Sequence, residues 1–183
     1  FSWEDLSARY QAELANGFGN LASRTLAMVT RYFDGVVPAA GELTPADKAI
    51  ADVVAAAAVE ADAAIERLAI HDAVTSIWTI VDALNGYITE QEPWALAKDP
   101  ANADRLATVL NTATEGLRAL AVLLSPFMPQ ATQKLWSALG VEGALGALTA
   151  QPIREAGVWG QVPVGTTVGA LEALFPRIES SAE

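Results

Sequence analysis

The chain has 183 residues and a formal net charge of -11, and hydrophobic residues make up 52% of the sequence. This length is enough to bury one sizeable core and is typical of a single domain with a tail. A strongly acidic chain repels polyanions at long range, so no broad binding to DNA or RNA is expected, and any nucleic-acid contact must be local. The chain contains no cysteine, which excludes disulfides and thiolate metal sites and fits a reducing, cytoplasmic compartment.

No membrane span or secretory signal is predicted. The longest alanine-rich stretch, residues 49–65, is interrupted by Asp52, Glu60 and Asp62, and these carboxylates indicate a solvated helix face. The residues after Phe1 lack both a basic start and an apolar core with a small-residue cleavage site. A first residue other than methionine suggests a piece of a longer chain.

The first predicted helix covers residues 4–31. Its apolar side chains recur every three, four or seven positions, as expected for a helix with one buried stripe; they are Leu6, Tyr10, Leu14, Phe18, Leu21, Met28 and Tyr32. Gly17 and Gly19 lie inside this pattern, and each costs about 1 kcal/mol relative to alanine in a helix. They therefore predict either a close helix contact or a local irregularity.

Four more helices follow in chain order. Thr44-Pro45-Ala46-Asp47 supplies an N-cap, a first-turn proline and an acidic third position, which predicts a helix that continues to about Leu68. The apolar spacing predicts further helices over residues 71–91, 102–124 and 129–139. Beyond Gly140 the composition favours loops, with one short helix at 168–174. The fold class is therefore all-α, a bundle of about five helices in residues 1–140 followed by an irregular C-terminal segment, residues 141–183.

Catalytic and metal chemistry has little basis in this sequence. His71 is the only histidine, so a multi-histidine metal site is excluded, and no glycine-rich phosphate motif occurs. His71, Asp72 and Ser76 could be imagined as an acid–base set, but residues at those offsets on a helix do not converge as nucleophilic catalysis requires. We predict no catalytic residue, no metal site and no cofactor in this chain.

Asn20 and Arg24 form a polar flank beside the apolar stripe of the first helix. At 100 degrees per residue they lie within one turn of each other, with Asn16 and Arg31 nearby. An amide next to a guanidinium presents planar donors and one acceptor, which is what recognition of a base edge requires. The alternative is that both side chains bond to helix ends or to carboxylates within the bundle.

Trp94 follows Pro93 at the end of the third predicted helix, where a rigid turn can hold an indole at the surface. A single-stranded base could stack on such a ring. Alternatively, Trp94 is a core anchor like Trp78 and Trp136. Periodicity does not decide between the two, but we expect Trp136, which lies within the short fifth helix, to be mostly core and Trp94 to be partly exposed.

Several segments resemble one known family. The segments RYQAELANGFGNLASRTLAMVTRYFDGVVP (9–38) and NGYITEQEPWALAKD (85–99) resemble the two hallmarks of the anticodon-binding domain of methionyl-tRNA synthetases, in the expected order. The segment LLSPFMPQATQKLWSALG (123–140) resembles a stretch shared more widely among class I synthetases, and LFPRIE (174–179) resembles the end of the family's core.

The resemblance implies a function. In the family, the residues that match Asn20 and Arg24 contact the first anticodon base, a cytosine, the tryptophan that matches Trp94 stacks on it, and the match to Pro93 positions that tryptophan. The implied partners are the anticodon loop of methionine tRNA, with its CAU anticodon, and the catalytic domain of the same enzyme. ATP with Mg and methionine would be substrates of the whole ligase.

The family's HIGH-like and KMSKS-like signatures for ATP do not occur in this chain, so we expect it to be inactive alone. The C-terminal segment is expected to dock on the bundle or on the catalytic half. The competing hypothesis is a helical protein-interaction domain without RNA contact, in which Asn20 and Arg24 satisfy groups of the bundle itself.

Overall fold

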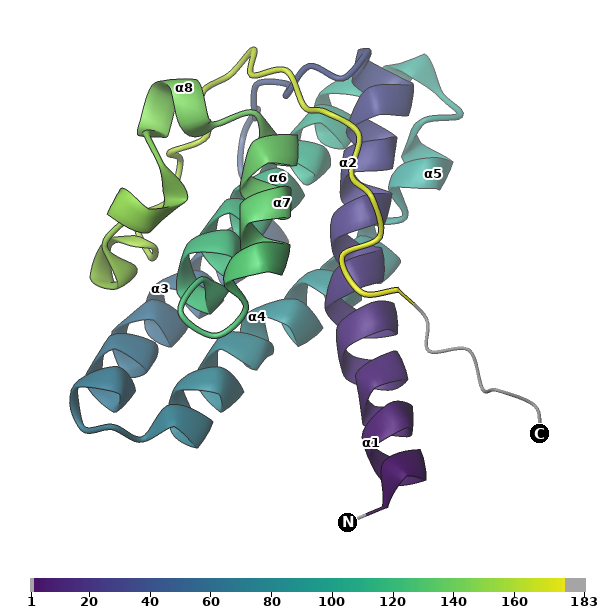
Figure 1. Cartoon of the computed structure of the whole chain (residues 1–183). Coiled ribbons are helices and arrows are strands. Elements are labelled where there is room, and N and C mark those ends of the chain that lie inside the picture. Colours follow the sequence, from purple (N-terminus) through teal and green to yellow (C-terminus); the bar gives the residue numbers. More distant parts are fainter. Residues whose placement is uncertain (1, 177–183) are drawn as a thin grey trace.

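The computed structural model describes residues 2–176, which form a helical bundle with an irregular C-terminal segment (Figure 1). All five predicted helices are present. Their bounds are α1 (Trp3–Arg9) with η1 (Tyr10–Gly19) and α2 (Asn20–Phe33), then α3 (Pro45–Glu66), α4 (Ile70–Gln91), α6 (Ala103–Leu124) and α7 (Pro129–Leu139). Short helical turns that the sequence did not predict are α5 (Pro93–Leu96), η2 (Pro100–Asn102), α8 (Glu142–Leu145), η3 (Leu148–Ala150) and η4 (Ile153–Glu155). No helix within residues 2–176 is long and apolar enough to cross a membrane.

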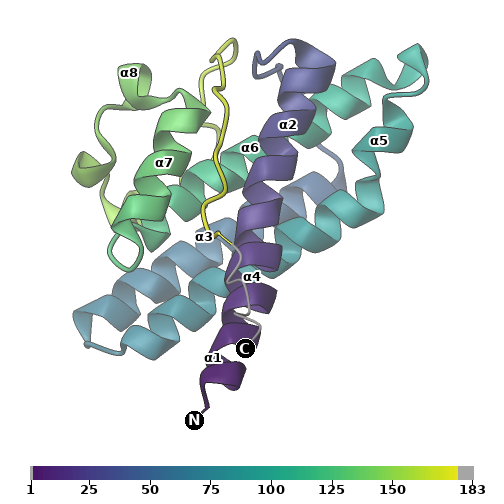
Figure 2. The same ribbon diagram turned by 45° about the vertical axis from the view of Figure 1, so that its right-hand side comes forward.

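The first three elements make one long helix that runs down the side of the bundle (Figure 2). The backbone stays right-handed through both junctions, and the middle section, η1, is wound as a π-helix. Gly17 and Gly19 lie in this section, so the predicted irregularity is present. The side-chain amide of Asn85 on α4 donates to the Gly17 carbonyl at 3.4 Å and to the Val81 carbonyl at 3.0 Å. The irregular section is thereby fixed against α4.

Helix α6 is the centre of the bundle. It is buried along most of its length from Leu106 to Leu124, and α3, α4 and α7 pack around it. The largest fully buried apolar side chains come mainly from α4, α6 and α7; they are Phe18, Ile77, Ile80, Leu84, Leu110, Leu117, Leu120, Leu123, Leu124, Leu135 and Trp136. The stripes predicted from the sequence therefore meet in one core.

The C-terminal segment does not form the predicted helix at 168–174. Instead it runs extended beside α2, as both views of the yellow trace show (Figures 1 and 2). Val168 N donates to the Gly35 carbonyl at 2.8 Å, and Gly169 N donates to the Ala138 carbonyl at 2.7 Å. These hydrogen bonds to other elements replace those of a helix. The prediction failed because the sequence of this segment favours a helix only weakly. Its backbone groups form hydrogen bonds with other elements instead.

Gly140 allows this segment to approach the end of α7. Its φ is +70, and a Cβ built there would lie 2.1 Å from the Thr167 carbonyl oxygen. Further along, Phe175 lies against Gly19, with ring-centroid distances of 6.0 Å to Phe18 and 6.2 Å to Tyr10. The segment therefore covers the long helix over much of its length. The last three residues of the LFPRIE motif lie outside the described residues.

A buried ion pair fastens the preceding loop. Arg118 Nε donates to Glu115 Oε1 at 2.6 Å, and both side chains are 2% exposed. Arg118 Nη2 also donates to the Ala156 carbonyl at 2.8 Å, and Glu115 Oε2 accepts from Val162 N at 2.9 Å. The charges are therefore surrounded by hydrogen-bond partners, which a buried pair requires. Leu148, Val162, Val168 and Leu174 join the same core, so residues 141–176 pack on the bundle.

Candidate nucleic-acid interface

Asn20 and Arg24 lie on the first turns of α2, where the π-wound section returns to regular helix. Leu21, Thr25 and Leu26 face the core, so the helix exposes the flank that carries Asn20 and Arg24. Within residues 2–176, neither side chain makes a hydrogen bond or an ion pair with the rest of the protein. Their donors and the amide oxygen remain available to a ligand. The hypothesis that they satisfy groups of the bundle is not supported.

Pro93 and Trp94 begin α5, directly after a sharp turn. Helix α4 ends at Gln91, the left-handed backbone of Glu92 (φ 44, ψ 58) reverses the chain, and Pro93 occupies the first position of α5. Pro93 is buried, whereas Trp94 is 36% exposed. By contrast, Trp136 is 0% exposed, and its Nε1 donates to the Gly146 carbonyl at 3.0 Å. Periodicity alone treats these two tryptophans alike, but we expected Trp136 to be mostly core and Trp94 to be partly exposed, and the structure confirms both expectations.

The structure brings Arg24 and Trp94 together although they are 70 positions apart in sequence. The guanidinium carbon of Arg24 lies 5.6 Å from the centroid of the Trp94 ring, a cation–π contact between α2 and α5. This contact leaves the N–H groups of the guanidinium without an acceptor in the described part of the chain. Planar donors are thus held over a partly exposed aromatic ring. Arg31 makes a similar contact, 5.6 Å from the Tyr32 ring on its own helix, so it does not join this pair.

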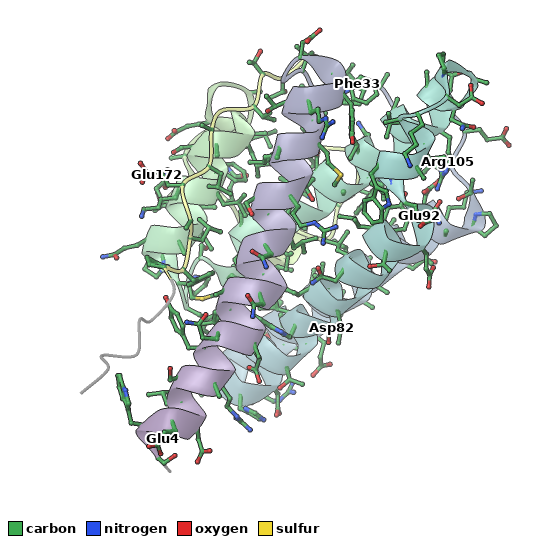
Figure 3. The ribbon with its side chains drawn as sticks, turned by 90° about the vertical axis from the view of Figure 1, so that its right-hand side faces the viewer. Glu4, Phe33, Asp82, Glu92, Arg105 and Glu172 are labelled. Carbon is green, nitrogen blue, oxygen red and sulfur yellow. The ribbon has the colours of Figure 1, made fainter. Side chains whose placement is uncertain are left out.

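A buried polar cluster lies at the same end of the bundle. Figure 3 shows Arg105 and Glu92 near Phe33, at the end opposite Glu4. Asp47, which is fully buried, accepts from Arg105 Nη1 at 2.6 Å and from Arg105 Nη2 at 2.9 Å. It also accepts from the Tyr87 hydroxyl and from the Thr44 hydroxyl and backbone N–H. Arg105 Nη2 donates in addition to Gln91 Oε1 at 2.6 Å.

The cluster keeps Asp47 ionised. Burial alone would raise the pKa of Asp47, but hydrogen bonds from Arg105, Tyr87 and Thr44 outweigh it and lower the pKa to about 2. Burial, together with the hydrogen bond to Asp47, raises the pKa of the Tyr87 hydroxyl. Sequence reasoning identified Asp47 only as a capping residue. Its distant partners, Tyr87 and Arg105, lie 40 and 58 positions away, and no local signal in the sequence indicates them.

The other sequence candidates do not assemble. Asp72 pairs with Arg67 at 3.6 Å, and the buried Ser76 hydroxyl has no hydrogen-bond partner in the described part of the chain. Neither residue is hydrogen-bonded to His71 there. Over residues 2–176, no group of three or more His, Asp or Glu side chains could hold a metal ion.

Comparison with known proteins decides the family. Residues 37–183 match the family described as the anticodon binding domain of methionyl tRNA ligase. The chain belongs to this family of anticodon-binding domains. The match includes Pro93 and Trp94 but begins after the helix that carries Asn20 and Arg24.

Relatives extend the similarity over the remaining helix. The methionine–tRNA ligase of Streptomyces coelicolor is 53% identical over 182 residues, which is 98% of this chain and 34% of that protein. The enzyme of Caldanaerobacter subterraneus is 37% identical over all of this chain and 28% of its own length. This anticodon-binding domain thus spans about a third of the length of the curated relatives it matches.

Solved structures agree with the fold. The free-state methionyl-tRNA synthetase of Mycobacterium tuberculosis superposes with a TM-score of 0.88 at 31% identity, covering 98% of this chain and 35% of that one. The structure of the same enzyme bound by methionyl-adenylate gives a TM-score of 0.83, covering 96% of this chain and 34% of that one. The all-α bundle predicted from the sequence is therefore the fold of this anticodon-binding family.

Proposed function

We propose that this domain recognises the CAU anticodon of methionine tRNA, with the first base, cytosine, bound between α2 and α5. Trp94 would stack on the base, Arg24 and Asn20 would contact its edge, and Pro93 would fix the indole. The observation that carries the proposal is the contact between Arg24 and Trp94, in which an exposed ring and unused planar donors meet at one place.

The chemistry of cytosine suits these side chains. Its pairing edge presents two acceptors and one amino donor. Arg24 supplies donors, and the amide of Asn20 supplies both an acceptor and donors. One well-placed edge contact and one stacked base contribute about 1 to 3 kcal/mol each. The edge contact alone corresponds to a preference of roughly 10- to 100-fold for the correct first base, whereas the stack adds affinity for any base.

The acidic character of the rest of the domain supports local recognition. A net charge of -11 repels the phosphate backbone at long range, so affinity has to come from the few groups that contact the loop. RNAs without cytosine as the first anticodon base would lose these contacts and bind less tightly.

We further propose that the domain serves a methionine–tRNA ligase, in which a separate catalytic domain uses ATP with Mg and methionine to aminoacylate the bound tRNA. The support is the family and the two relatives named above, both of them methionine–tRNA ligases about three to four times as long as this chain. The partition between the bundle, residues 1–140, and residues 141–183 stays part of this proposal, with the second segment docking on the bundle or on the catalytic half.

The direct test is binding of four RNA stem-loops that differ only in the first anticodon base, measured at low salt with the 183-residue chain. We expect the CAU loop to bind at least about tenfold tighter than the others, the lower bound set by one edge contact. Equal affinity for all four loops would contradict the proposal.

A further inference from the structure

We propose that Arg105 and Gln91 are positioning residues that hold Trp94 in place through the end of α4. The inference rests on the proposed role of Trp94 in binding the base. Neither side chain belongs to the exposed edge formed by Asn20, Arg24 and Trp94.

The first step is the connection between Gln91 and Trp94. Gln91 is the last residue of α4, and only Glu92 and Pro93 separate it from the indole-bearing residue. Glu92 has one fixed left-handed conformation, and its carbonyl accepts from Ala95 N at 2.7 Å and Leu96 N at 3.1 Å. Pro93 locks its own φ. A short, stiff turn of this kind transmits the position of Gln91 to Trp94.

The second step is what holds Gln91. Its side-chain oxygen accepts from Arg105 Nη2 at 2.6 Å, while both terminal nitrogens of Arg105 bond to Asp47. Asp47 belongs to α3 and Arg105 to α6, so the hydrogen bonds tie the end of α4 to two other helices. The planar fork of arginine can bridge a carboxylate and an amide at once, which a lysine ammonium cannot do in the same geometry.

The third step concerns where Trp94 must lie. The indole has to remain within reach of Arg24 on α2, and that contact spans 5.6 Å. Helix α5 is only four residues long and has no side-chain cap, so its position depends on the stiff turn that precedes it. The hydrogen-bonded cluster at the end of α4 fixes where that turn begins. Functional side chains that are precisely placed are commonly fixed by such supporting hydrogen bonds.

A pair of matched variants tests this inference. Gln91→Met keeps the side-chain length but removes the acceptor for Arg105. Thr44→Val removes a different hydrogen bond from the same cluster, the one from the Thr44 hydroxyl to Asp47 at 2.9 Å, and leaves the bond between Arg105 and Gln91 in place. Each variant is labelled with 5-fluorotryptophan, and the Trp94 fluorine resonance is identified by its loss in Trp94→Phe. Affinity for the CAU stem-loop and melting temperature are measured in parallel.

We expect Gln91→Met to shift or broaden the Trp94 resonance and to weaken stem-loop binding roughly two- to tenfold, the effect of one hydrogen bond. Thr44→Val should lower the melting temperature without changing either readout. Gln91→Glu, which keeps the acceptor, should preserve the wild-type resonance. If Gln91→Met does not fold, Arg105→Lys replaces it with the same expected resonance shift.

The inference is overturned if the Trp94 resonance stays at its wild-type position in Gln91→Met, or if Thr44→Val moves it equally. The fluorine readout needs no RNA. A wild-type chain that fails to bind the stem-loop would therefore contradict the proposed function, while the resonance still decides whether Gln91 positions Trp94.

Discussion

Arg118 and Arg24 both project from long helices, but they are used in opposite ways. Arg118 is 1% exposed and bonds to Glu115 and to two backbone carbonyls. Arg24 is exposed, lies against the ring of Trp94 and has no hydrogen-bond acceptor within residues 2–176. Within the fold, a buried charge has to be fully satisfied, whereas an unsatisfied exposed charge remains available for binding. The interior clusters should therefore control stability, and the exposed edge should control affinity.

The sharpest test of this contrast uses the two tryptophans. Trp136→Ala removes a fully buried ring, which typically costs about 3 to 5 kcal/mol of unfolding free energy. Trp94→Ala should leave stability nearly unchanged but weaken stem-loop binding by roughly 1 to 3 kcal/mol. Urea unfolding and stem-loop titration on both variants measure the two effects. If Trp94→Ala unfolds the domain as badly as Trp136→Ala and leaves affinity per folded molecule unchanged, the contrast is wrong.

Arg118→Met tests the interior cluster directly. The variant leaves Glu115 as a buried charge without its partner, which typically costs about 3 to 5 kcal/mol. Replacing both residues, in Glu115→Gln with Arg118→Met, should cost less because no buried charge remains. We expect urea unfolding to show this order, and amide exchange to speed up around residues 156–162. A double variant less stable than Arg118→Met would count against this account of the pair.

The pH dependence of stability should reveal the cluster around Asp47. Its folded-state pKa, about 2, lies below the ordinary value of 3.8, so its contribution is fully present above about pH 4. As the pH falls toward 2, about 2 kcal/mol should be lost, given roughly 1.4 kcal/mol per pKa unit.

Urea unfolding at pH 6 and pH 2.5 measures this loss, with Asp47→Asn as the variant that cannot titrate. Glu60→Gln is the control, since Glu60 pairs with Arg67 at an exposed, solvent-screened site. The same pH dependence in wild type and in Asp47→Asn would show that Asp47 is not responsible.

The smallest expected effect on stability belongs to Arg24→Lys. This variant keeps the charge but loses the planar fork that matches a base edge. The preference for cytosine as first anticodon base should fall about tenfold, the lower end of one edge contact, while the melting temperature barely changes. Competition between stem-loops measures the preference. A large loss of stability with unchanged preference would mean that Arg24 serves the fold.

Sequence alone predicted the elements with local signals. The helices follow from apolar periodicity, and the start of α3 follows from Thr44 and Pro45. The buried charged clusters around Asp47 and around Arg118 could not be predicted, because a charged residue on a helix is normally expected on the outer face. Glu115 and Arg118 are satisfied by a loop about 40 residues later. The extended course of residues 168–174 likewise depends on distant carbonyls.

The arrangement of the exposed edge could likewise be predicted only in part from the sequence. The resemblance indicated Asn20, Arg24, Pro93 and Trp94 together, and helical spacing placed the first two on one flank. Neither showed that Arg24 would contact Trp94, because that contact depends on how α5 turns after Glu92. Gln91 and Arg105 were missed because their hydrogen bond joins two helices and leaves no pattern in the sequence.

The extended segment beside the long helix has a consequence for synthesis. Phe18 is covered on one side by Phe175, and the Tyr10 hydroxyl donates to the Pro176 carbonyl at 3.0 Å, 166 positions away. Contacts so distant in sequence form late, since a chain emerging from the ribosome presents residue 18 long before residue 175. The helix that carries Asn20 and Arg24 is thus made well before the segment that covers it. We expect it to be among the last to reach its final packing, so that a chain shortened before Phe175 leaves an apolar strip of that helix open to chaperones.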